Sequence, residues 1–495
     1  MKLYSSNTGE YSMVMAYPAI EEFALSSLGY LWLYKIADEK DGINATRIST
    51  DNISINKKSM NALAFSMSFD FDYLGVLEIL EKLNIPFLAK DRDEKFPIIF
   101  AGGPVLTTNP APYEAFFDFM ILGDGEDVFD KVLDILKQKL SKEETLNELS
   151  KLDGIYISGK KTKRTVVPLN KVIYTPIISE KSYFKNTFVI EVARGCMNRC
   201  AFCTASYTNL PFRNYEYEKI IEAIELGLKH TNKIALLGAQ ISAHPKFADI
   251  MEYIKNKIEN GADIEMGISS LRTDSITPEI VQTLVAGGQK HSTIAIEAAS
   301  ERLRKFINKN LKEEQILSAV KISKENGLKG LKIYSMIGIP TETDEDINEF
   351  ISLAKKIKEQ NKGFNIEFSF STFVPKPQTP LQWAKREDTK TLEKKQKFLE
   401  KELSKLGISS KFSSAKWDYW QTVLSRSGKE ITPLLIDVYK NGGKIGAYKS
   451  ALTNTDIDIS KSTEGFLLDE TLPWDCIDYP KQQLINEYNR LQKYV

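Results

Sequence analysis

Three cysteines, Cys196, Cys200 and Cys203, lie within eight residues in the segment EVARGCMNRCAFCTAS. Three neighbouring thiolates can hold a metal ion or a metal cluster, or they can form a disulfide that leaves one thiol over. Structural zinc sites usually close with four ligands, and the fourth cysteine, Cys476, follows about 270 residues later. Iron-sulfur clusters are held by cysteine thiolates, and three ligands on a four-iron cluster leave one iron open to a small molecule. The spacing C-x3-C-x2-C therefore favours a [4Fe-4S] cluster over zinc or a redox disulfide.

The cysteines directly follow a predicted strand, Thr187 to Val192, whose β-branched and aromatic residues are typical of a buried position. Five further strands are predicted at 233–237, 264–270, 292–296, 331–337 and 365–373. Helical patterns separate them, so we expect a partial (β/α)6 barrel of the TIM-barrel type over residues 183–385. In such barrels the active site lies at the carboxyl ends of the strands, which is where the cysteines stand.

Polar residues and glycines stand at nearly every one of these strand ends. These candidate binding residues are Gly238, Ala239, Gln240, Ser270, Arg272, Glu297, Gly338 and Pro340. The guanidinium of Arg272 suits a carboxylate partner, and Glu297 can accept a proton or bind hydroxyl groups. The alternative is that Arg272, Glu297 and Glu342 form ion pairs on the rim of the barrel.

Strand and helix patterns also alternate through the first 140 residues, with strands at 11–17, 62–69, 97–101 and 117–122 and helices at 20–36 and 73–83. This alternation predicts a doubly wound, Rossmann-like parallel sheet over residues 1–140. Small residues at its strand ends form the expected ligand edge: Ser66, Ser68, Gly102, Gly103, Gly123 and Gly125. Glycines let a cofactor approach the backbone closely, although they can equally cap tight strand-to-helix turns.

The rest of the chain is expected to connect and cover these two parts. Residues 141–182 begin rich in lysine and glutamate, and we predict a linker with a short strand pair around 154–157 and 164–167. Residues 386–495 are predicted to be a mostly helical region, with a first helix over 389–406.

Composition narrows the class of protein further. Lys plus Arg and Asp plus Glu number 66 each among 495 residues, so charge does not indicate a nucleic-acid partner. The sequence starts without an apolar run of signal-peptide length, and no uncharged apolar segment reaches ~18 residues. Three of the four cysteines are clustered, which fits a reducing compartment. We therefore expect a cytoplasmic protein without a membrane span.

The cysteine spacing, with Phe202 directly before the third cysteine, resembles the signature of the radical S-adenosylmethionine superfamily. The resemblance implies a [4Fe-4S] cluster whose open iron binds the amino and carboxylate groups of S-adenosylmethionine. One electron from the reduced cluster then yields methionine and a 5′-deoxyadenosyl radical, which abstracts hydrogen from a substrate. An electron donor such as flavodoxin or ferredoxin is implied as a partner.

The same resemblance assigns roles to the candidates in the barrel. Gly238-Ala239-Gln240 occupies the place of a Gly-Gly-Glu motif that contacts the methionine amino group, with the amide of Gln240 in place of a carboxylate. Ser270 and Arg272 stand where contacts to the ribose and the carboxylate are found. Glu297 is placed to reach ribose hydroxyls, and Gly338 with Pro340 stands where backbone borders the adenine.

The N-terminal segments AGGP, TTNPAPYEAFF and ILGDGED resemble the cobalamin-binding-like domain of one large branch of this superfamily. Matching pieces continue through SSLRTDS, GIPTETDED, STFVPKPQTPLQW and LPWDCID, nearly end to end. The chain departs from the pattern because its three histidines, His230, His244 and His291, all follow the cysteines, and the D-x-H-x-x-G pattern is absent. If this domain binds a corrinoid, the lower face of its cobalt is bare, water-bound or covered by a residue other than histidine. The alternative is a domain that kept the fold and lost the cofactor.

Three hypotheses follow for the function. The leading one is a radical enzyme that functionalises an unactivated carbon by cobalamin-dependent methyl transfer, on a substrate that the sequence does not identify. The second keeps the radical step with another outcome, such as methylthiolation of tRNA, cyclisation or carbon-carbon coupling; tRNA methylthiotransferases, however, carry three additional N-terminal cysteines, and here none precedes Cys196. The third is a non-catalytic iron-sulfur sensor or nucleic-acid-binding protein with a fully ligated cluster.

Overall fold

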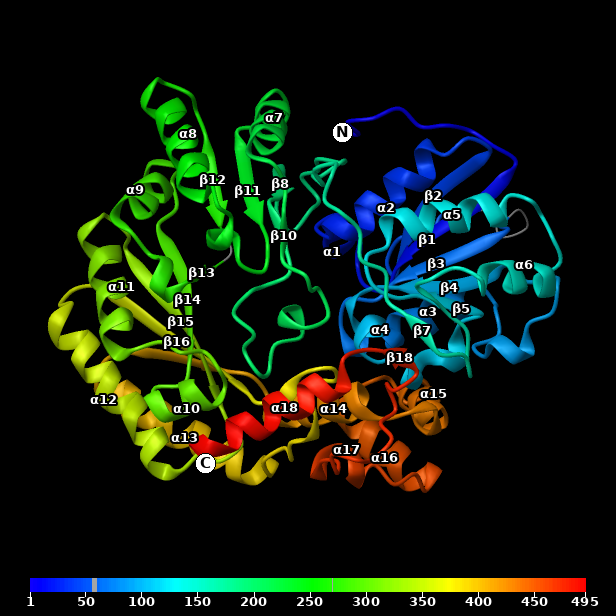
Figure 1. The fold of residues 1–495 in the computed structure, drawn as a ribbon. Helices are drawn as coiled ribbons and strands as arrows, with labels where there is room; N and C mark the ends of the chain where they lie inside the picture. Colours follow the sequence, from blue (N-terminus) through cyan, green and yellow to red (C-terminus); the bar gives the residue numbers. More distant parts are fainter. Residues whose placement is uncertain (56–59, 269) are drawn as a thin grey trace.

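The computed structural model describes residues 1–55, 60–268 and 270–495. Ser269, which we expected in a strand ending at Ser270, lies outside the described residues. Figure 1 shows an N-terminal sheet and a curved barrel sheet side by side, with the C-terminal helices crossing from one to the other. Ligand sites at the strand ends of the two sheets can therefore lie close to each other.

The N-terminal part is a six-stranded sheet in the order β2-β1-β3-β4-β5-β6. Its strands are β1 (Tyr11–Tyr17), β2 (Ile43–Ser49), β3 (Ala62–Ser66), β4 (Ile98–Gly102), β5 (Phe119–Ile121) and β6 (Ile155–Tyr156). Neighbouring strands are parallel except for β6, which runs antiparallel to β5. The strand order reverses between β1 and β3, and doubly wound sheets bind ligands at such a switch point. The predicted doubly wound fold is confirmed, although β2 was not predicted and β6 comes from the expected linker.

Helices cover both faces of this sheet because alternate residues of each strand point to opposite sides. Met13 and Met15 of β1 share a core with α2 (Leu28–Glu39) and α5 (Glu126–Leu136), whereas Val14 shares one with α3 (Tyr73–Lys82). The single helix expected over 20–36 is wrong. It is divided into α1 (Glu21–Ala24) and α2, because the backbone at Ser27 is extended, with φ −85° and ψ 101°.

The barrel part consists of two parallel sheets, β12-β11-β8 and β13-β14-β15-β16-β17. The strands are β8 (Thr187–Glu191), β11 (Lys233–Leu237), β12 (Glu265–Ile268), β13 (Leu271–Arg272), β14 (His291–Glu297), β15 (Gly330–Ile337), β16 (Asn365–Thr372) and β17 (Ser409–Phe412). Helices α7 (Tyr217–Leu228), α8 (Phe247–Glu259), α9 (Pro278–Ala286), α11 (Glu313–Glu325), α12 (Asp344–Gln360) and α13 (Thr389–Lys405) lie on the outside of the curve (Figure 1). The partial barrel is confirmed, and β17 extends it with a strand from the region expected to be helical.

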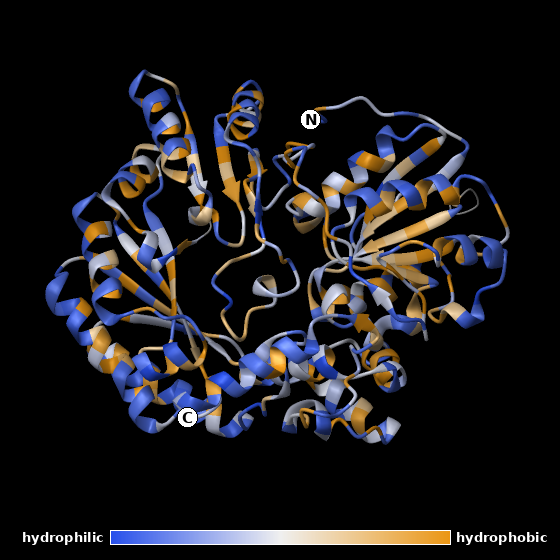
Figure 2. Cartoon of the chain, in the orientation of Figure 1, coloured by the Kyte–Doolittle hydropathy of each residue, from blue (hydrophilic) through white to orange (hydrophobic). Residues whose placement is uncertain are grey.

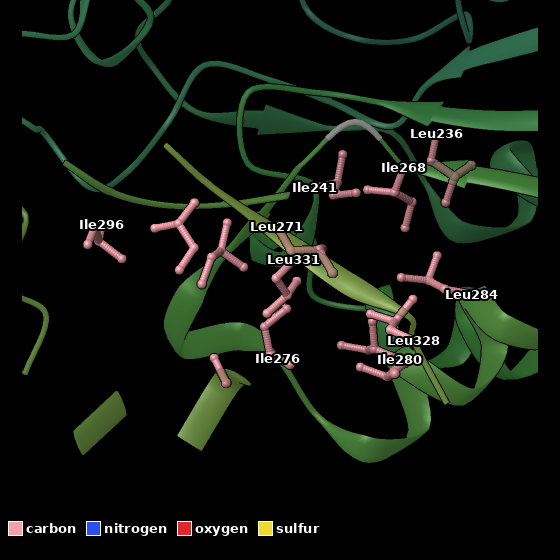
Figure 3. Close-up of a cluster of buried hydrophobic side chains, with 14 of the residues drawn as sticks. Leu236, Ile241, Ile268, Leu271, Ile276, Ile280, Leu284, Ile296, Leu328 and Leu331 are labelled. Carbon is pink, nitrogen blue, oxygen red and sulfur yellow. The ribbon is translucent and has the colours of Figure 1, made fainter. Parts of the chain in front are cut away.

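The hydrophobic core of the barrel lies between the strands and these outer helices. In β16, Phe368 and Phe370 are buried and meet Phe350 of α12 edge to face, with ring centroids 5.1 Å apart for the Phe350–Phe370 pair. Figure 3 shows part of the same core, where Ile268 of β12, Leu284 of α9 and neighbouring hydrophobic side chains gather. In Figure 2 hydrophobic and hydrophilic residues are mixed along the barrel strands, and the outer helices carry long hydrophilic stretches. The inner face of the barrel is thereby left for polar residues.

The C-terminal helices fix the N-terminal sheet relative to the barrel. Tyr448 of α16 (Ile445–Thr455) shares a 2.7 Å hydrogen bond between hydroxyls with Tyr73. Asp70 accepts from Nζ of Lys376, which follows β16, at 2.7 Å and from Oγ of Ser425 in α14 (Ala415–Arg426) at 2.8 Å. These bonds join all three parts of the chain.

The expected linker contains α6 (Lys142–Leu149) and two short strands. The strand pair that we predicted within it is wrong: β6 joins the N-terminal sheet, and β7 (Thr162–Lys163) pairs with β18 (Ile477–Asp478) near the end of the chain. Among the described residues, no helix combines the length and the apolar character that crossing a membrane requires.

Candidate active site

A loop that begins after β8 holds the three cysteines, and a pair of short antiparallel strands closes its base. These strands are β9 (Ala193–Arg194) and β10 (Arg213–Asn214). Cys196 and Cys200 are buried. Burial above all, with the neighbouring Cys203 adding to the effect, raises the pKa of the Cys200 thiol to about 12. Burial likewise raises the pKa of Cys203, with Cys196 adding to the effect. Cys203 therefore opposes the ionisation of Cys200, and Cys196 opposes that of Cys203.

Cysteine thiolates are the usual ligands of iron-sulfur clusters. Among the described residues, no three His, Cys, Asp or Glu side chains converge on one metal position. A four-iron cluster binds each thiolate through a different iron, so its ligands need not meet at one point. Buried thiols ionise more readily when a metal or a neighbouring cationic side chain supplies positive charge. The donor set thus fits the cluster that the sequence predicted.

The turn after α10 (Glu301–Phe306) holds the cysteine loop in place. Asn308 Nδ2 donates to the carbonyl oxygens of Asn198 at 3.3 Å and Arg199 at 2.9 Å. The backbone N–H of Ala201 donates to the carbonyl of Ile307 at 2.9 Å. Phe202 packs against the apolar cluster formed around Phe306, so its aromatic ring anchors the loop. These contacts fix the backbone on which the thiols stand.

Charged residues from β13, β14 and the same turn gather beside Cys200. Lys309 Nζ lies 3.0 Å from Oε1 of Glu297, and Arg272 Nη2 donates to the Lys309 carbonyl at 3.0 Å. Lys309 and Arg272 lower the pKa of Cys200, whereas Glu297 raises it. Burial opposes the charge of Lys309, but Glu297 and Cys200 outweigh it and raise the Lys309 pKa. The structure brings the predicted Arg272 and Glu297 together and adds Lys309, which the sequence analysis missed within the stretch IEAASERLRKFINKN.

Glu297 has an uncommon backbone conformation for its position. Its φ is +65°, and the pairing of β14 with β15 shifts register between Ala295 and Glu297. Left-handed backbone in a residue other than glycine costs ~1–3 kcal/mol and persists where the surroundings impose it. This backbone irregularity occurs at Glu297, whose carboxylate pairs with Lys309 beside the cysteines.

The predicted Gly238-Ala239-Gln240 segment reaches the cysteine loop through its last residue. Oε1 of Gln240 lies 3.4 Å from Sγ of Cys196, and Nδ2 of Asn198 lies 3.5 Å from the same sulfur. A Cβ at Gly238 would lie 2.9 Å from the carbonyl oxygen of Ala193, so close packing accounts for this glycine. Ala239 is exposed, as is Ser270 next to β13.

Gly338 and Pro340 line a separate cavity of about 440 Å³, together with Phe306 and Tyr488 of α18 (Lys481–Leu491). Gly338 has φ +75°, and its N–H donates to Oε1 of Glu342 at 2.9 Å. Glu342 pairs with Lys395 at 2.7 Å, which is the rim ion pair that we weighed as the alternative for this residue. The expected role of Gly338 and Pro340 beside the adenine stays a prediction.

Cys476 lies away from the cysteine loop. Its environment includes Tyr156 of β6 and Glu114, and burial raises its pKa to about 11. Its backbone carbonyl accepts from the N–H of Thr162 at 3.0 Å, in the β7–β18 pair. The structure therefore assigns Cys476 no part in the donor set around Cys200.

The N-terminal sheet carries a cavity of about 370 Å³ at its strand ends, which we call the N-terminal cavity. All six predicted residues line it: Ser66, Ser68, Gly102, Gly103, Gly123 and Gly125. Its size falls within the ~300–1,000 Å³ of small-molecule sites. Apolar rings such as Trp32, Phe100 and Phe129 form much of the wall, and the described lining residues include no histidine. Glu191, Arg194, Asn209 and Leu237 of the barrel side complete the lining.

The glycines of this cavity fall into two groups. Gly103 and Gly123 have φ of +128° and +94°, and a Cβ would lie 2.1 Å and 2.3 Å from backbone oxygens, so their turns require glycine. At Gly102 and Gly125 the nearest atoms to a Cβ are 3.4 Å away, which is ordinary contact. The backbone does not demand these two glycines. These two positions add no side chain to the wall of the N-terminal cavity.

Two family models match the chain. Residues 33–158 match the N-terminal domain of radical SAM proteins, and residues 190–354 match the radical SAM superfamily. An uncharacterised protein of Methanocaldococcus jannaschii is 31% identical over 396 residues, covering 78% of this chain and 81% of that protein. An uncharacterised methyltransferase of Pyrococcus horikoshii is 26% identical over 335 residues, covering 63% of this chain and 69% of the relative.

The fold also matches a solved structure, the cobalamin-dependent S-adenosylmethionine radical enzyme OxsB with aqua-cobalamin and S-adenosylmethionine bound. The match covers 97% of this chain and 79% of that chain, with a TM-score of 0.57 and 12% sequence identity. At this identity the likeness concerns the fold: a Rossmann-like sheet followed by a radical SAM barrel. With its cysteine loop, its two family-model matches and its relative in M. jannaschii, the chain belongs to the radical S-adenosylmethionine superfamily.

Proposed function

We propose that the chain is a radical S-adenosylmethionine enzyme that transfers a methyl group to an unactivated carbon, with a corrinoid held in the N-terminal cavity. The observation that carries this proposal is the position of that cavity. Its lining combines the bare glycines of the N-terminal sheet with Glu191 and Arg194, which lead directly into the cysteine loop. A methyl donor and a radical source placed so close can act on one substrate.

In the barrel, Cys196, Cys200 and Cys203 are the proposed ligands of a [4Fe-4S] cluster. Such a cluster supplies the electron that splits S-adenosylmethionine into methionine and a 5′-deoxyadenosyl radical. Lys309 and Arg272 bring positive charge next to Cys200 and so favour its thiolate. The burial of Cys196 and Cys200 keeps water away from this corner of the site.

In the N-terminal cavity, Gly102 and Gly125 are the proposed floor beneath a flat ring. A corrinoid bound there supplies a transferable methyl group. The backbone turns at Gly103 and Gly123 shape the strand ends, and Phe100 and Trp32 provide apolar walls. The methyltransferase among the relatives supports this outcome. We further propose a cytoplasmic location and a flavodoxin or ferredoxin as electron donor.

The test begins with anaerobic reconstitution of iron and sulfide, followed by chemical reduction in the presence of S-adenosylmethionine. We expect release of 5′-deoxyadenosine, because the proposal leaves one iron open to the cofactor. No release from protein with full iron content would favour a closed cluster in a sensor. Titration with hydroxocobalamin then tests the second half. Release of 5′-deoxyadenosine without any spectral change at stoichiometric corrinoid would exclude methyl transfer and favour a radical enzyme of another outcome.

A further inference from the structure

Arg194 lies between three carboxylates where the N-terminal cavity meets the cysteine loop. Its Nη1 is 2.9 Å from Oδ1 of Asp124, and its Nη2 is 2.6 Å from Oε1 of Glu126. Its Nε and Nη2 also donate to Glu191, at 3.0 Å and 2.8 Å. Burial opposes the charge of Arg194, but Glu191 and Glu126 outweigh it and raise the Arg194 pKa above its ordinary value. Asp124 lies between β5 and α5, and Glu126 is the first residue of α5, so Arg194 joins the N-terminal part to the barrel part.

Asp124 also secures the base of the cysteine loop. Arg194 of β9 pairs directly opposite Arg213 of β10, and like charges directly opposite each other destabilise a strand pair. Oδ2 of Asp124 lies 2.6 Å from Nη1 of Arg213, while its other oxygen binds Arg194. One carboxylate from the N-terminal sheet therefore neutralises both arginines that close the loop.

Glu126 has an unused hydrogen-bonding oxygen. Its Oε2 is buried, and it has no hydrogen-bond partner among the described residues. Glu126 is the first residue of α5, directly after Gly125, and it lines the N-terminal cavity. A buried carboxylate oxygen without a hydrogen-bond partner is destabilising. A ligand in the cavity that donates an N–H or O–H would recover this cost. The amide side chains on the rim of a corrin ring are donors of this class.

We propose that Glu126 contacts the ligand in the N-terminal cavity and that Arg194 transmits occupancy of this cavity to the base of the cysteine loop. The inference rests on the proposed function, because the ligand it names is a corrinoid. Arg194 can act in this way since one guanidinium binds the cavity-lining Glu126 and the loop-closing Asp124 together. Such coupling is reciprocal. If ligand binding in the N-terminal cavity affects the cysteine loop, the affinity for that ligand must differ between cluster-loaded and cluster-free protein. Coupling between sites typically changes affinity about 5–150-fold.

The experiment measures hydroxocobalamin affinity by visible absorbance in cluster-loaded and cluster-free protein. For wild type we expect dissociation constants that differ at least about fivefold between the two states. Glu126→Gln keeps the shape of the side chain but weakens its bonds to Arg194 and the ligand. We expect about tenfold weaker binding, a ratio between the two states close to one, and unchanged iron content. Asp127→Asn, an exposed neighbour in the first turn of α5, is the matched control and should behave as wild type.

A second variant and a second readout keep the test decisive if Glu126→Gln folds poorly. Arg194→Lys keeps the charge but cannot bridge three carboxylates, so its ratio should also fall close to one. The electron paramagnetic resonance spectrum of the reduced cluster should change on adding hydroxocobalamin in wild type and in Asp127→Asn, but not in Glu126→Gln. A wild-type ratio that persists in both variants would overturn the inference and leave the proposed function intact. Wild type that binds no hydroxocobalamin in either state would remove the corrinoid from the proposed function, and the inference with it.

Discussion

The two strand-end sites of this molecule are built in opposite ways. The N-terminal cavity is shaped by side chains that are missing, at Gly102 and Gly125, between apolar rings. The barrel site is shaped by side chains that are present, with thiols next to the Glu297–Lys309 pair. The same rule places both sites, because ligands of parallel α/β folds bind at the carboxyl ends of strands. The difference teaches that thiols and charged residues indicate a site by their residue type alone. A glycine indicates a site only when the structure shows that the local backbone does not require glycine.

The largest effect is expected from removing a proposed cluster ligand, because the barrel site depends on its thiol side chains. Changing Cys200 to Ala should abolish iron binding at stoichiometric levels. Loss of 5′-deoxyadenosine release should exceed 100-fold, because even residues that only support metal ligands cost ~10–100-fold when removed. The measurements are iron and sulfide content and product release after anaerobic reconstitution.

Cys476→Ala is the control for this prediction, since Cys476 lies beside Tyr156 and Glu114 rather than in the loop. It should reconstitute as wild type does. A Cys200→Ala protein that retains a full cluster would contradict the assignment of the thiols. Equal damage from Cys476→Ala would show that general thiol loss, and not ligation, is being measured.

The next effect concerns the charge balance that distinguishes the barrel site. Lys309→Met leaves the Glu297 carboxylate, half-buried beside Cys200, without the cation 3.0 Å away. Breaking a buried pair in this way costs about 3–5 kcal/mol, and we expect a loss of about 3 kcal/mol in the free energy of unfolding. Urea unfolding of the cluster-free protein measures it.

The double variant Lys309→Met with Glu297→Gln separates the pair from the packing. It should recover most of the loss, because no unpaired charge remains, and the double-mutant cycle isolates the pairwise contribution. A single-variant loss below about 1 kcal/mol would mean that solvent screens the pair and that the barrel site is less enclosed than the structure indicates.

Much of the fold could be predicted because its periodicities are local. The strand β1 was expected at its observed residues, and α13 was expected within one residue of its end. The strand β2 could not be read so easily, since INATRIS carries polar residues on an edge strand. The break between α1 and α2 was missed because the apolar pattern continues across Ser27, whereas the backbone there turns to an extended conformation.

The candidate sites show the same division. The cysteines and six small residues that line the N-terminal cavity could be named from their types and their place at strand ends, and their roles stay predictions. The sequence analysis missed the ion pairs of Lys309 and of Arg194, since both depend on partners from distant segments. Lys309 pairs with Glu297 from β14, and Arg194 pairs with Asp124 across the two parts of the chain. Sequence spacing alone does not reveal such contacts.

A smaller effect is expected from filling the N-terminal cavity. Gly102→Val places a branched side chain where a Cβ meets only ordinary contacts at 3.4 Å, so the fold should accept it. The extra volume should instead exclude a flat ligand. We expect about 100-fold weaker hydroxocobalamin binding, which corresponds to about 2.8 kcal/mol, with 5′-deoxyadenosine release unchanged. Gly446→Val is the control, since nothing lies within 4 Å of a Cβ there. Unchanged affinity in Gly102→Val would place the corrinoid elsewhere or exclude it.

The smallest effect tests the junction between the two sites through its dependence on pH. Burial opposes the charge of Asp124, but Arg194 and Arg213 outweigh it and hold the Asp124 pKa below its usual value. A carboxylate with a lowered pKa in the folded state stabilises the fold at pH values above its unfolded pKa of ~3.9, and this contribution is lost as the pH falls through the folded pKa. Asp124→Asn should therefore cost about 2 kcal/mol near pH 7, and the difference from wild type should shrink below about pH 4. Urea unfolding at several pH values measures this, with Asp127→Asn expected within about 0.5 kcal/mol of wild type throughout. A cost for Asp124→Asn that stays constant down to the lowest pH would mean that the carboxylate is not held ionised by the two arginines, and the two strand-end sites would then be joined by shape rather than by charge.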